Sequence, residues 1–555
     1  MPDRWPSAFA GSRASGAALG PPSGGVWTNV ERPGASVGHG VPRRFRARRI
    51  SYRDCTGAHG RMRGWVLHAG KTAGPIQPKQ ERRHMPEWHA YYHWLNPGDN
   101  AWQMTAATFV GLMSLPGLAV LYGGVMQKRW SVNSMMLTFV AFCLVLVAWC
   151  LWAFKMGFGH PVAHSGSGVF GSHGFLGTFL GEPGSVLGHI GEQGQAEIPS
   201  ITTGPPFHFP QASLVYFQFV FAAITPILML GSVLGRVNFK AWIPFVLLWI
   251  TCVYTVNAFL IWGGGYFAAH GAIDYSGGYV IHLAAGISGF VAAAVIGPRL
   301  QRDREVDAPN NLLMVAVGAG ILWLGWNGFN GGDSYYAGAN ASAAVLNTNL
   351  CTAVAMLVWI AWDYIFRDKP SLIGSVNGMI TGLVCITPAA GFVNGYGAIV
   401  IGVIGSTVVW MAIRFLSRAP IFRSVDDTLG VVYTHGIAGL TGGLLVGVLA
   451  DPNIIEYIGI GKTPSIFAEG AIHGNWALLR WQAEAAGWVI IFSGIVTFIL
   501  LKLVSIFIPL RLSDEELEIG DHAIHGNEVY PSDVPTLGGP HPPVWQPEPA
   551  PAGAA

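Results

Sequence analysis

The sequence reads HLAAGISG at residues 282–289 and HGIAGLTG at residues 435–442. Both stretches begin with histidine, place alanine and glycine three and four residues later, and end on glycine. Each lies in an apolar segment long enough to cross a bilayer, where an ionisable side chain is costly and rare. A single such histidine could be a hydrogen-bonded core residue, but the same residue in the same frame of two spans indicates a shared function.

The composition around these stretches is that of a membrane protein. The 555 residues are 51% hydrophobic and only 11% charged, whereas about a quarter of the residues in soluble proteins are charged. Repeated apolar runs match the thickness of a bilayer, and 74 glycines suit closely packed membrane helices. The six cysteines form no CxxC pair, so we expect packing roles rather than redox chemistry.

We predict an all-α polytopic membrane protein with eleven transmembrane helices. Lysine and arginine follow each odd-numbered span, beginning with Lys128 and Arg129, and are sparse in the alternate loops. Because positively charged loops stay in the cytoplasm, we expect the amino terminus outside and the carboxyl tail inside. The predicted spans are 102–126, 131–155, 211–235, 241–263, 278–298, 311–330, 341–366, 372–391, 395–416, 429–450 and 485–508.

An internal repeat orders these spans. His282 falls in the fifth predicted span and His435 in the tenth, and the tripeptide ITP occurs in the third span (224–226) and the eighth (386–388). The chain therefore divides into two five-helix repeats and a final helix. Because five is odd, the repeats have opposite orientations, and inverted repeats place the substrate path at their interface. We expect the two histidines to meet there.

The pair of histidines limits the chemistry of this path. The predicted spans hold few other ionisable groups, so we expect within them no buried carboxylate that binds sodium or a metal and no acidic proton relay. We also expect no metal site, no cofactor and no catalytic residue. Two neutral imidazoles can share one hydrogen bond and still offer donors and acceptors to a small polar solute. An apolar lumen penalises a bare cation far more than a small neutral molecule. An intramembrane metalloenzyme lacks the further ligands that it would need.

The two ends of the chain differ from its middle. Residues 1–84 hold 15 Lys or Arg and four Asp or Glu, a net charge of +11, and we predict a disordered basic extension and leader over 1–100. Translocating this segment would conflict with the expected topology, so we expect translation to begin at or near Met85 and no nucleic-acid-binding arm. A transmembrane domain is expected over 101–508 and a cytoplasmic regulatory tail over 509–555.

Several long motifs resemble the ammonium transporter (Amt/MEP/Rh) family, over about residues 101–530. In order along the chain they are MSLPGLAVLYGGVMQKRWSVNSMM, FQFVFAAIT, WGGGYFAAHGAIDYSGGYVIHLAAGISG, GWNGFNGG, KPSLIGSVNGMITGLVCITPAAGFV and THGIAGLTGGLLVG. The resemblance implies a multi-pass protein of the cell (inner) membrane that assembles as a homotrimer with one pore per subunit. It also implies a PII-type signalling protein as a possible partner of the tail.

Carried over position by position, the resemblance implies a path with an outer recruitment site, an aromatic gate and a lumen lined by histidines. The residues are Trp262 and Phe217 for recruitment, Asp274 beneath them, Phe221 and Phe329 for the gate, and His282 and His435 for the lumen.

The chemistry of these side chains suits such roles. A tryptophan face attracts a cation by up to ~2 kcal/mol when partly desolvated. By position alone, however, Trp262 is typical of an interfacial aromatic belt and Asp274 of a helix cap. Asp333 departs from the resemblance, because many members of the family carry a small hydroxyl residue at this position of the recruitment site. Two alternatives are open: a second carboxylate there tightens cation binding, or it points away from the site.

The sequence therefore predicts an ammonium transporter that recruits NH4+ outside, deprotonates it and conducts NH3 into the cytoplasm, with or without the proton. Potassium resembles ammonium in charge and size but cannot lose a proton, so the apolar lumen would exclude it. Two alternatives stay open. One is a passive NH3 or CO2 gas channel of the Rh type, which has no need of Trp262, and the other is an ammonium sensor that acts through a bound partner.

Overall fold

A computed structural model describes residues 92–162, 174–200, 207–306, 308–367, 369–454 and 467–530. Within these ranges the regular structure is helical, with isolated bridge pairs and no β-strand. The described residues all belong to one unit, Glu87–Ala555. The predicted extension at 1–84, the start at Met85 and the tail beyond residue 530 lie outside them.

Ten helices of the described chain are long and apolar enough to cross a membrane, and they match predicted spans one to seven and nine to eleven in order. They are Pro97–Val125 (α1, Pro97–Leu112; η1, Met113–Gly117; α2, Leu118–Val125), Lys128–Phe158 (η2, Lys128–Trp130; α3, Ser131–Ala148; η3, Trp149–Ala153; α4, Phe154–Phe158), Gln211–Leu230 (α7), Phe239–Ala269 (α8, Phe239–Trp249; η4, Ile250–Tyr254; α9, Thr255–Ile261; α10, Tyr266–Ala269), Gly278–Ile296 (η5, Gly278–Leu283; α11, Ala284–Ile296), Leu312–Gly332 (α13), Ala339–Phe366 (within α14, Ala339–Arg367), Gly395–Arg418 (α16, Gly395–Phe415; η6, Leu416–Arg418), Val432–Leu449 (η7, Val432–Ile437; α18, Ala438–Leu449) and Trp476–Ser505 (α19).

Shorter helices complete the described chain. They are α5 (Gly174–Phe179), α6 (His189–Gln193), α12 (Gln301–Glu305), α15 (Leu372–Ile386), α17 (Pro420–Arg423), η8 (Ala471–His473), α20 (Asp514–Ile519) and α21 (Asp521–His525).

The eighth predicted span, 372–391, contains a shorter helix than the sequence predicts. Its helix α15 has 15 residues, fewer than the ~20 that a straight crossing needs. Pro388 cannot donate a helical hydrogen bond, and the chain continues as buried turns through Val393. The third span behaves alike, because α7 ends at Leu230 and turns follow it. Irregular backbone at membrane depth is tolerated where protein encloses it or where it lines a cavity.

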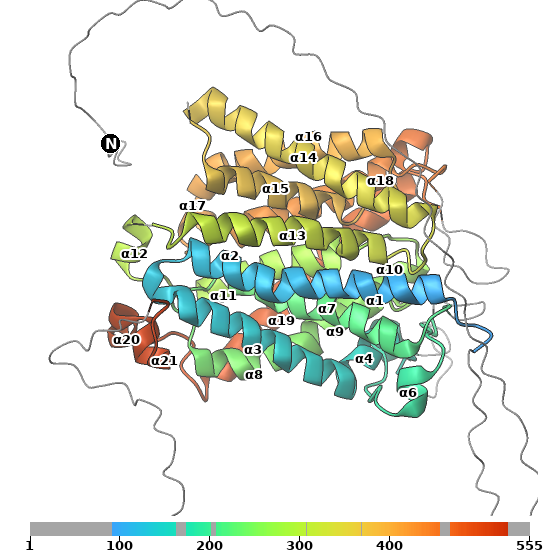
Figure 1. Cartoon of the computed structure of the whole chain (residues 1–555), viewed down its shortest axis with the longest axis horizontal. Coiled ribbons are helices and arrows are strands. Elements are labelled where there is room, and N and C mark those ends of the chain that lie inside the picture. Colours follow the sequence, from blue (N-terminus) through green and yellow to red (C-terminus); the bar gives the residue numbers. More distant parts are fainter. Residues whose placement is uncertain are drawn as a thin grey trace, which may run out of the picture. The chain divides into compact units, whose positions relative to one another are not determined.

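The spanning helices run side by side, and their connections gather at two ends (Figure 1). One end carries α12, α17, α20 and α21, and the other carries α6 and α10. α7 is the most enclosed helix, since every residue from Phe217 to Leu230 is buried. The helices α14 and α19 instead expose apolar side chains such as Leu346, Leu357 and Ile491, as expected of a surface in contact with lipid tails.

The carboxyl-terminal segment 509–530 packs against the start of the second span, Lys128–Phe158. The Arg129 guanidinium donates hydrogen bonds to two backbone carbonyls of α20. The Asp521 carboxylate accepts hydrogen bonds from the backbone N–H groups of Val132 and Asn133, at 2.7 and 2.8 Å. These N–H groups begin α3 and have no helical partner of their own, so Asp521 acts as a cap supplied by the tail.

We expect Asp521→Asn to loosen the tail, because an amide oxygen accepts hydrogen bonds more weakly than a carboxylate. Amide hydrogen exchange in α20 and in the first turn of α3 should rise about tenfold, equivalent to ~1.4 kcal/mol of lost charge-assisted bonding. Glu515→Gln is the matched control, because Glu515 is an exposed residue of α20. Equal protection in the two variants would contradict the capping role.

Candidate functional site

His282 and His435 meet in the interior of the helix bundle. Their Nδ1 atoms are 3.2 Å apart and their ring centroids 5.3 Å apart. His282 is fully buried and His435 is 7% exposed. Among the described residues, the Nε2 atom of His282 has no hydrogen-bond partner. The structure thus brings together the two histidines that the repeated stretches pair.

Glycines four residues after each histidine explain the shared sequence pattern. A Cβ atom on Gly286 would lie 2.3 Å from the backbone nitrogen of Gly436, and one on Gly439 would lie 2.4 Å from the carbonyl oxygen of Gly278. The helices η5–α11 and η7–α18 can cross this closely only because both positions lack a side chain. This close crossing brings the imidazole rings within hydrogen-bonding distance.

A carboxylate caps each histidine helix, eight residues before the histidine. The Asp274 carboxylate accepts hydrogen bonds from the four N–H groups of residues 277–280, at 2.6–3.2 Å. Asp427 accepts two at the start of η7, at 3.1 and 2.8 Å. Three residues after each aspartate is a glycine with positive φ, 109° at Gly277 and 69° at Gly430, a conformation that favours glycine. Asp274 is therefore a helix cap, as its position alone indicates.

Each capped turn is also joined to an unwound segment of another helix. The two N–H groups that follow Asp274 donate to carbonyls of residues 387–388, just beyond α15. The two that follow Asp427 donate to carbonyls of residues 231–232, just beyond α7. Carbonyl groups left without a helical partner must be satisfied within the protein at this depth. The ends of α7 and α15 and the two capped turns satisfy one another.

These contacts change the alignment of the two repeats that the ITP tripeptides indicate. The tripeptides pair the third span with the eighth, and the contacts pair the same two spans. The equivalent contacts, however, relate Ser232 to Pro388, whereas the tripeptides would relate Pro226 to Pro388. The feature that repeats in the two halves is a main-chain carbonyl that accepts a hydrogen bond. Any residue can supply such a carbonyl, so a match of side chains does not show which residues of the two halves correspond.

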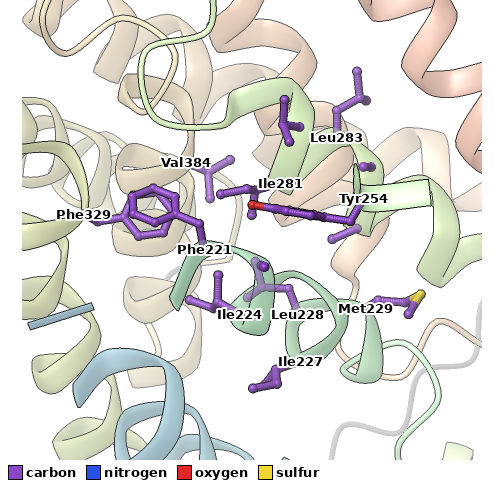
Figure 2. Packing of buried hydrophobic residues seen from close by; sticks show 14 of the residues in the cluster. Phe221, Ile224, Ile227, Leu228, Met229, Tyr254, Ile281, Leu283, Phe329 and Val384 are labelled. Carbon is purple, nitrogen blue, oxygen red and sulfur yellow. The ribbon is translucent and has the colours of Figure 1, made fainter. Parts of the chain in front are cut away.

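A column of aromatic rings leads from Trp262 to the histidines. Trp262 meets Phe221 edge-on, with ring centroids 6.4 Å apart. Phe221 lies 4.3 Å from Phe329, and Phe329 stacks 6.0 Å from His282. Figure 2 shows the two phenylalanine rings lying against each other between α7 and α13. Phe217 packs on Phe221 at 4.7 Å, and all three phenylalanines are fully buried, so their rings fill this part of the path.

Two cavities reach the ends of this column. The large cavity has a volume of about 720 Å³ and is lined by Trp262, Asp274 and Asp333 among others. The small cavity has a volume of about 240 Å³ and reaches His435 and Tyr122. Phe221, Phe329 and His282 line neither cavity. In the column of ring contacts these three rings lie between Trp262, which lines the large cavity, and His435, which lines the small one.

Two carboxylates outside the predicted spans are buried beside this path. Asp274 is 5% exposed and Asp333 is 7% exposed. Both lie between spanning helices in the sequence, but the connections that carry them fold back into the bundle and line the large cavity. Within the described ranges, no group of three or more His, Cys, Asp or Glu side chains is placed to hold a metal ion.

Sequence reasoning missed two residues of the site, Asp427 and Trp326. Asp427 could have been found from its spacing, because DYSGGYVIH and DTLGVVYTH both place an aspartate eight residues before the histidine. Trp326 stacks on His282 with centroids 5.3 Å apart and donates its indole N–H to Thr387 at 2.9 Å. No local pattern distinguishes it from the other 20 of the 21 tryptophans.

Comparison with known proteins agrees with this architecture. The model of the Ammonium Transporter Family matches residues 101–530. Ammonium transporter 3 member 2 of Oryza sativa subsp. japonica is 48% identical over 446 residues, which cover 79% of this chain and 90% of that protein. Ammonium transporter 2 of Arabidopsis thaliana is 47% identical over 439 residues, 79% of this chain and 89% of that protein.

Solved structures share the fold. Saccharomyces cerevisiae Mep2 superposes with a TM-score of 0.64 at 29% identity, covering 76% of this chain and 89% of the other. Candida albicans Mep2 gives a TM-score of 0.64 at 27% identity, covering 76% of this chain and 88% of the other.

We expect Gly286→Ala to force the two histidine helices apart, because the new Cβ would lie 2.3 Å from backbone. Overpacking of this kind costs ~1–3 kcal/mol, so the melting temperature of the detergent-purified protein should fall. Gly320→Ala is the control, since a Cβ there meets nothing within 4 Å and alanine favours the helix. A Gly286→Ala protein as stable as the Gly320→Ala protein would refute the close-crossing account.

Proposed function

The chain belongs to the ammonium transporter family, and we propose that it takes up NH4+ from the large cavity and conducts NH3 past the paired histidines. It is an ammonium transporter with several membrane-spanning helices. One observation carries the mechanism: buried phenylalanine rings and the buried His282 lie between Trp262, which lines the large cavity, and His435, which lines the small one. A bare cation would lose its hydration there at great cost, whereas a small neutral amine would not.

Recruitment begins in the large cavity, where NH4+ rests against Trp262. The fully buried Phe221 ring packs edge-on against Trp262, and Phe217 packs on Phe221, so both lie where the closed part of the path begins. Aromatic faces attract a cation through their quadrupole, and tryptophan does so most strongly. The Trp262 indole N–H donates a 2.6 Å hydrogen bond to the backbone carbonyl of Asp274, which fixes the orientation of the ring. The Asp274 carboxylate is engaged by four N–H groups, so it favours the positive ion through its charge and not by contact.

Conduction follows loss of a proton from the recruited ion near Trp262 and Phe221, with water in the large cavity as the proton acceptor. The proton then either stays outside or crosses separately from NH3, and only the second case carries a current. NH3 then passes Phe221 and Phe329, whose rings must separate, because in this conformation they fill the path. In the lumen NH3 exchanges hydrogen bonds with the Nε2 atoms of the histidines, and the unpartnered Nε2 of His282 supports this step. Potassium cannot lose a proton, so the cost of desolvating its charge excludes it.

We also propose eleven membrane crossings, with α15 and its unwound continuation as the eighth, arranged as two inverted five-helix repeats and a final helix. The matching contacts of the capped turns with residues 231–232 and 387–388 support the repeat. The helices α12 and α17, whose sequences include arginine, lie at the same end of the bundle (Figure 1), which supports an amino terminus outside and a tail inside.

The family resemblance further supports a homotrimer in the cell (inner) membrane, with transport by residues 101–508. The tail, 509–555, then lies at the cytoplasmic face. We propose that a PII-type signalling protein would bind there, near the surface that segment 509–530 shares with the start of the second span.

Current on a solid-supported membrane after an ammonium jump tests the function, with the full chain in proteoliposomes. If the proton crosses as well as NH3, we expect a saturable current that is absent after a potassium jump and lost in His282→Ala/His435→Ala. If the proton stays outside, the same dependence should appear as internal alkalinisation without a current. Trp262→Leu should raise the apparent KM roughly tenfold, given ~1–2 kcal/mol for a cation on a tryptophan face. Trp476→Leu is the matched control, because Trp476 is 68% exposed on α19 and its loss should leave the current intact.

Other outcomes would select the alternatives. Internal alkalinisation by NH3 that survives Trp262→Leu, with no current, would favour a gas channel. Equal effects of Trp262→Leu and Trp476→Leu would place Trp262 in an interfacial belt. Absence of both the current and the internal alkalinisation, with ammonium-dependent binding of a PII protein, would favour a sensor.

A further inference from the structure

The last spanning helix, α19, places a side-chain amide inside the bundle. Gln482 of α19 is fully buried. Its side-chain oxygen accepts a hydrogen bond from the backbone N–H of Ile273 at 2.8 Å. Its side-chain nitrogen donates to the backbone carbonyls of Ile273 and Gly443, at 2.7 and 2.9 Å. A buried amide is costly unless its hydrogen bonds are made, and Gln482 makes all of them with the main chain of two other segments.

The first of these segments carries the cap of a histidine helix. Ile273 lies in the connection between α10 and η5, where the chain has no regular structure. Main-chain groups of an irregular segment inside a membrane protein need partners from elsewhere, and Gln482 supplies them for both groups of Ile273. The next residue is Asp274, whose carboxylate caps η5 and whose carbonyl accepts the Trp262 indole N–H. Gln482 therefore holds the residue directly before this cap.

The second segment is the helix of the other histidine. Gly443 lies in α18, eight residues after His435. The helices α18 and α19 approach closely here, since a Cβ atom on Gly447 would lie 2.9 Å from the backbone of α19. This approach brings the Gln482 amide within hydrogen-bonding distance of the Gly443 carbonyl. One side chain thus joins the connection that carries Asp274 to the helix that carries His435.

We propose that Gln482 is a positioning residue for ammonium transport, which holds the Asp274 connection against α18 so that Trp262 keeps its orientation in the large cavity. The proposal rests on the proposed function, because Trp262 acts in the recruitment step. Gln482 lines neither cavity, so it acts through Ile273 and Asp274 and not by contact with the ion. An apolar side chain of the same length would leave three main-chain hydrogen bonds unmade.

The test removes the amide with Gln482→Met, which keeps a side chain of similar length. A lost hydrogen bond of ordinary strength should raise the apparent KM for ammonium about fivefold. The maximal rate should stay within about threefold, because both histidines are retained. Transport is measured as the current or the internal alkalinisation, whichever the wild type shows.

Thr497→Val is the matched control. Thr497 is another fully buried polar residue of α19, and its hydroxyl is hydrogen-bonded to Trp249 and Ser288. It touches neither the Asp274 connection nor Gly443, so its loss should lower the melting temperature of the purified protein but change the KM less than twofold. An unchanged KM in Gln482→Met, or equal KM changes in the two variants, would overturn the proposal.

A double variant distinguishes positioning of Trp262 from general damage. If Gln482 acts through Trp262, the KM of Gln482→Met/Trp262→Leu should lie within twofold of that of Trp262→Leu alone, because residues that act as one unit are not additive. Independent, multiplying increases of the KM would instead refute the positioning role.

Hydrogen exchange tests the same role without transport. The N–H groups of residues 277–280, which Asp274 caps, should exchange about tenfold faster in Gln482→Met and at the wild-type rate in Thr497→Val. A wild type that does not transport ammonium but shows this difference would keep Gln482 as the residue that positions Asp274, while the transport mechanism fails. Exchange at the wild-type rate in Gln482→Met would contradict the proposal.

Discussion

The two aspartate caps on the histidine helices are the interactions on which the rest of the pore depends. A helix that starts inside a membrane protein exposes N–H groups that water cannot satisfy. Asp274 and Asp427 accept these groups with their carboxylates, and each cap fixes where its helix begins. The histidine follows eight residues later, so the position of each ring along the pore is set by its cap. The glycine crossing then sets the distance between the rings.

Asp274 also links the lumen to the recruitment ring. Its carboxylate holds the start of η5, while its main-chain carbonyl receives the indole N–H of Trp262 at 2.6 Å. A displacement of Trp262 by a bound ion would therefore act on the same residue that anchors His282. The described contacts of Asp427 do not include an equivalent aromatic ring. Both halves thus position a histidine with an aspartate cap, but only the Asp274 cap is also bonded to a tryptophan among the described contacts.

The amino-acid pattern predicts the order of the spans and the meeting of the histidines, because both depend on features that repeat or extend over many residues. Apolar runs reveal which segments are enclosed by lipid and protein, but they do not reveal where a helix unwinds inside the bundle. For that reason the short α15 and the buried turns after Leu230 were not predictable from hydropathy. The sequence singled out Asp333, but its burial was not predictable for a related reason, since a carboxylate in a connection between spans is expected at the surface unless that connection folds inward.

The facing Nδ1 atoms of His282 and His435 couple the tautomers of the two rings. Only one hydrogen can lie between two nitrogens 3.2 Å apart, so the ring that donates it presents a lone pair at Nε2, and the ring that accepts it presents an N–H there. Exchange of the two tautomers reverses this polarity without any change in net charge. NH3 has both a lone pair and N–H groups, so it is accommodated in either state. The lumen thus has no built-in direction, and the direction of net flow is set by the electrochemical gradient across the membrane.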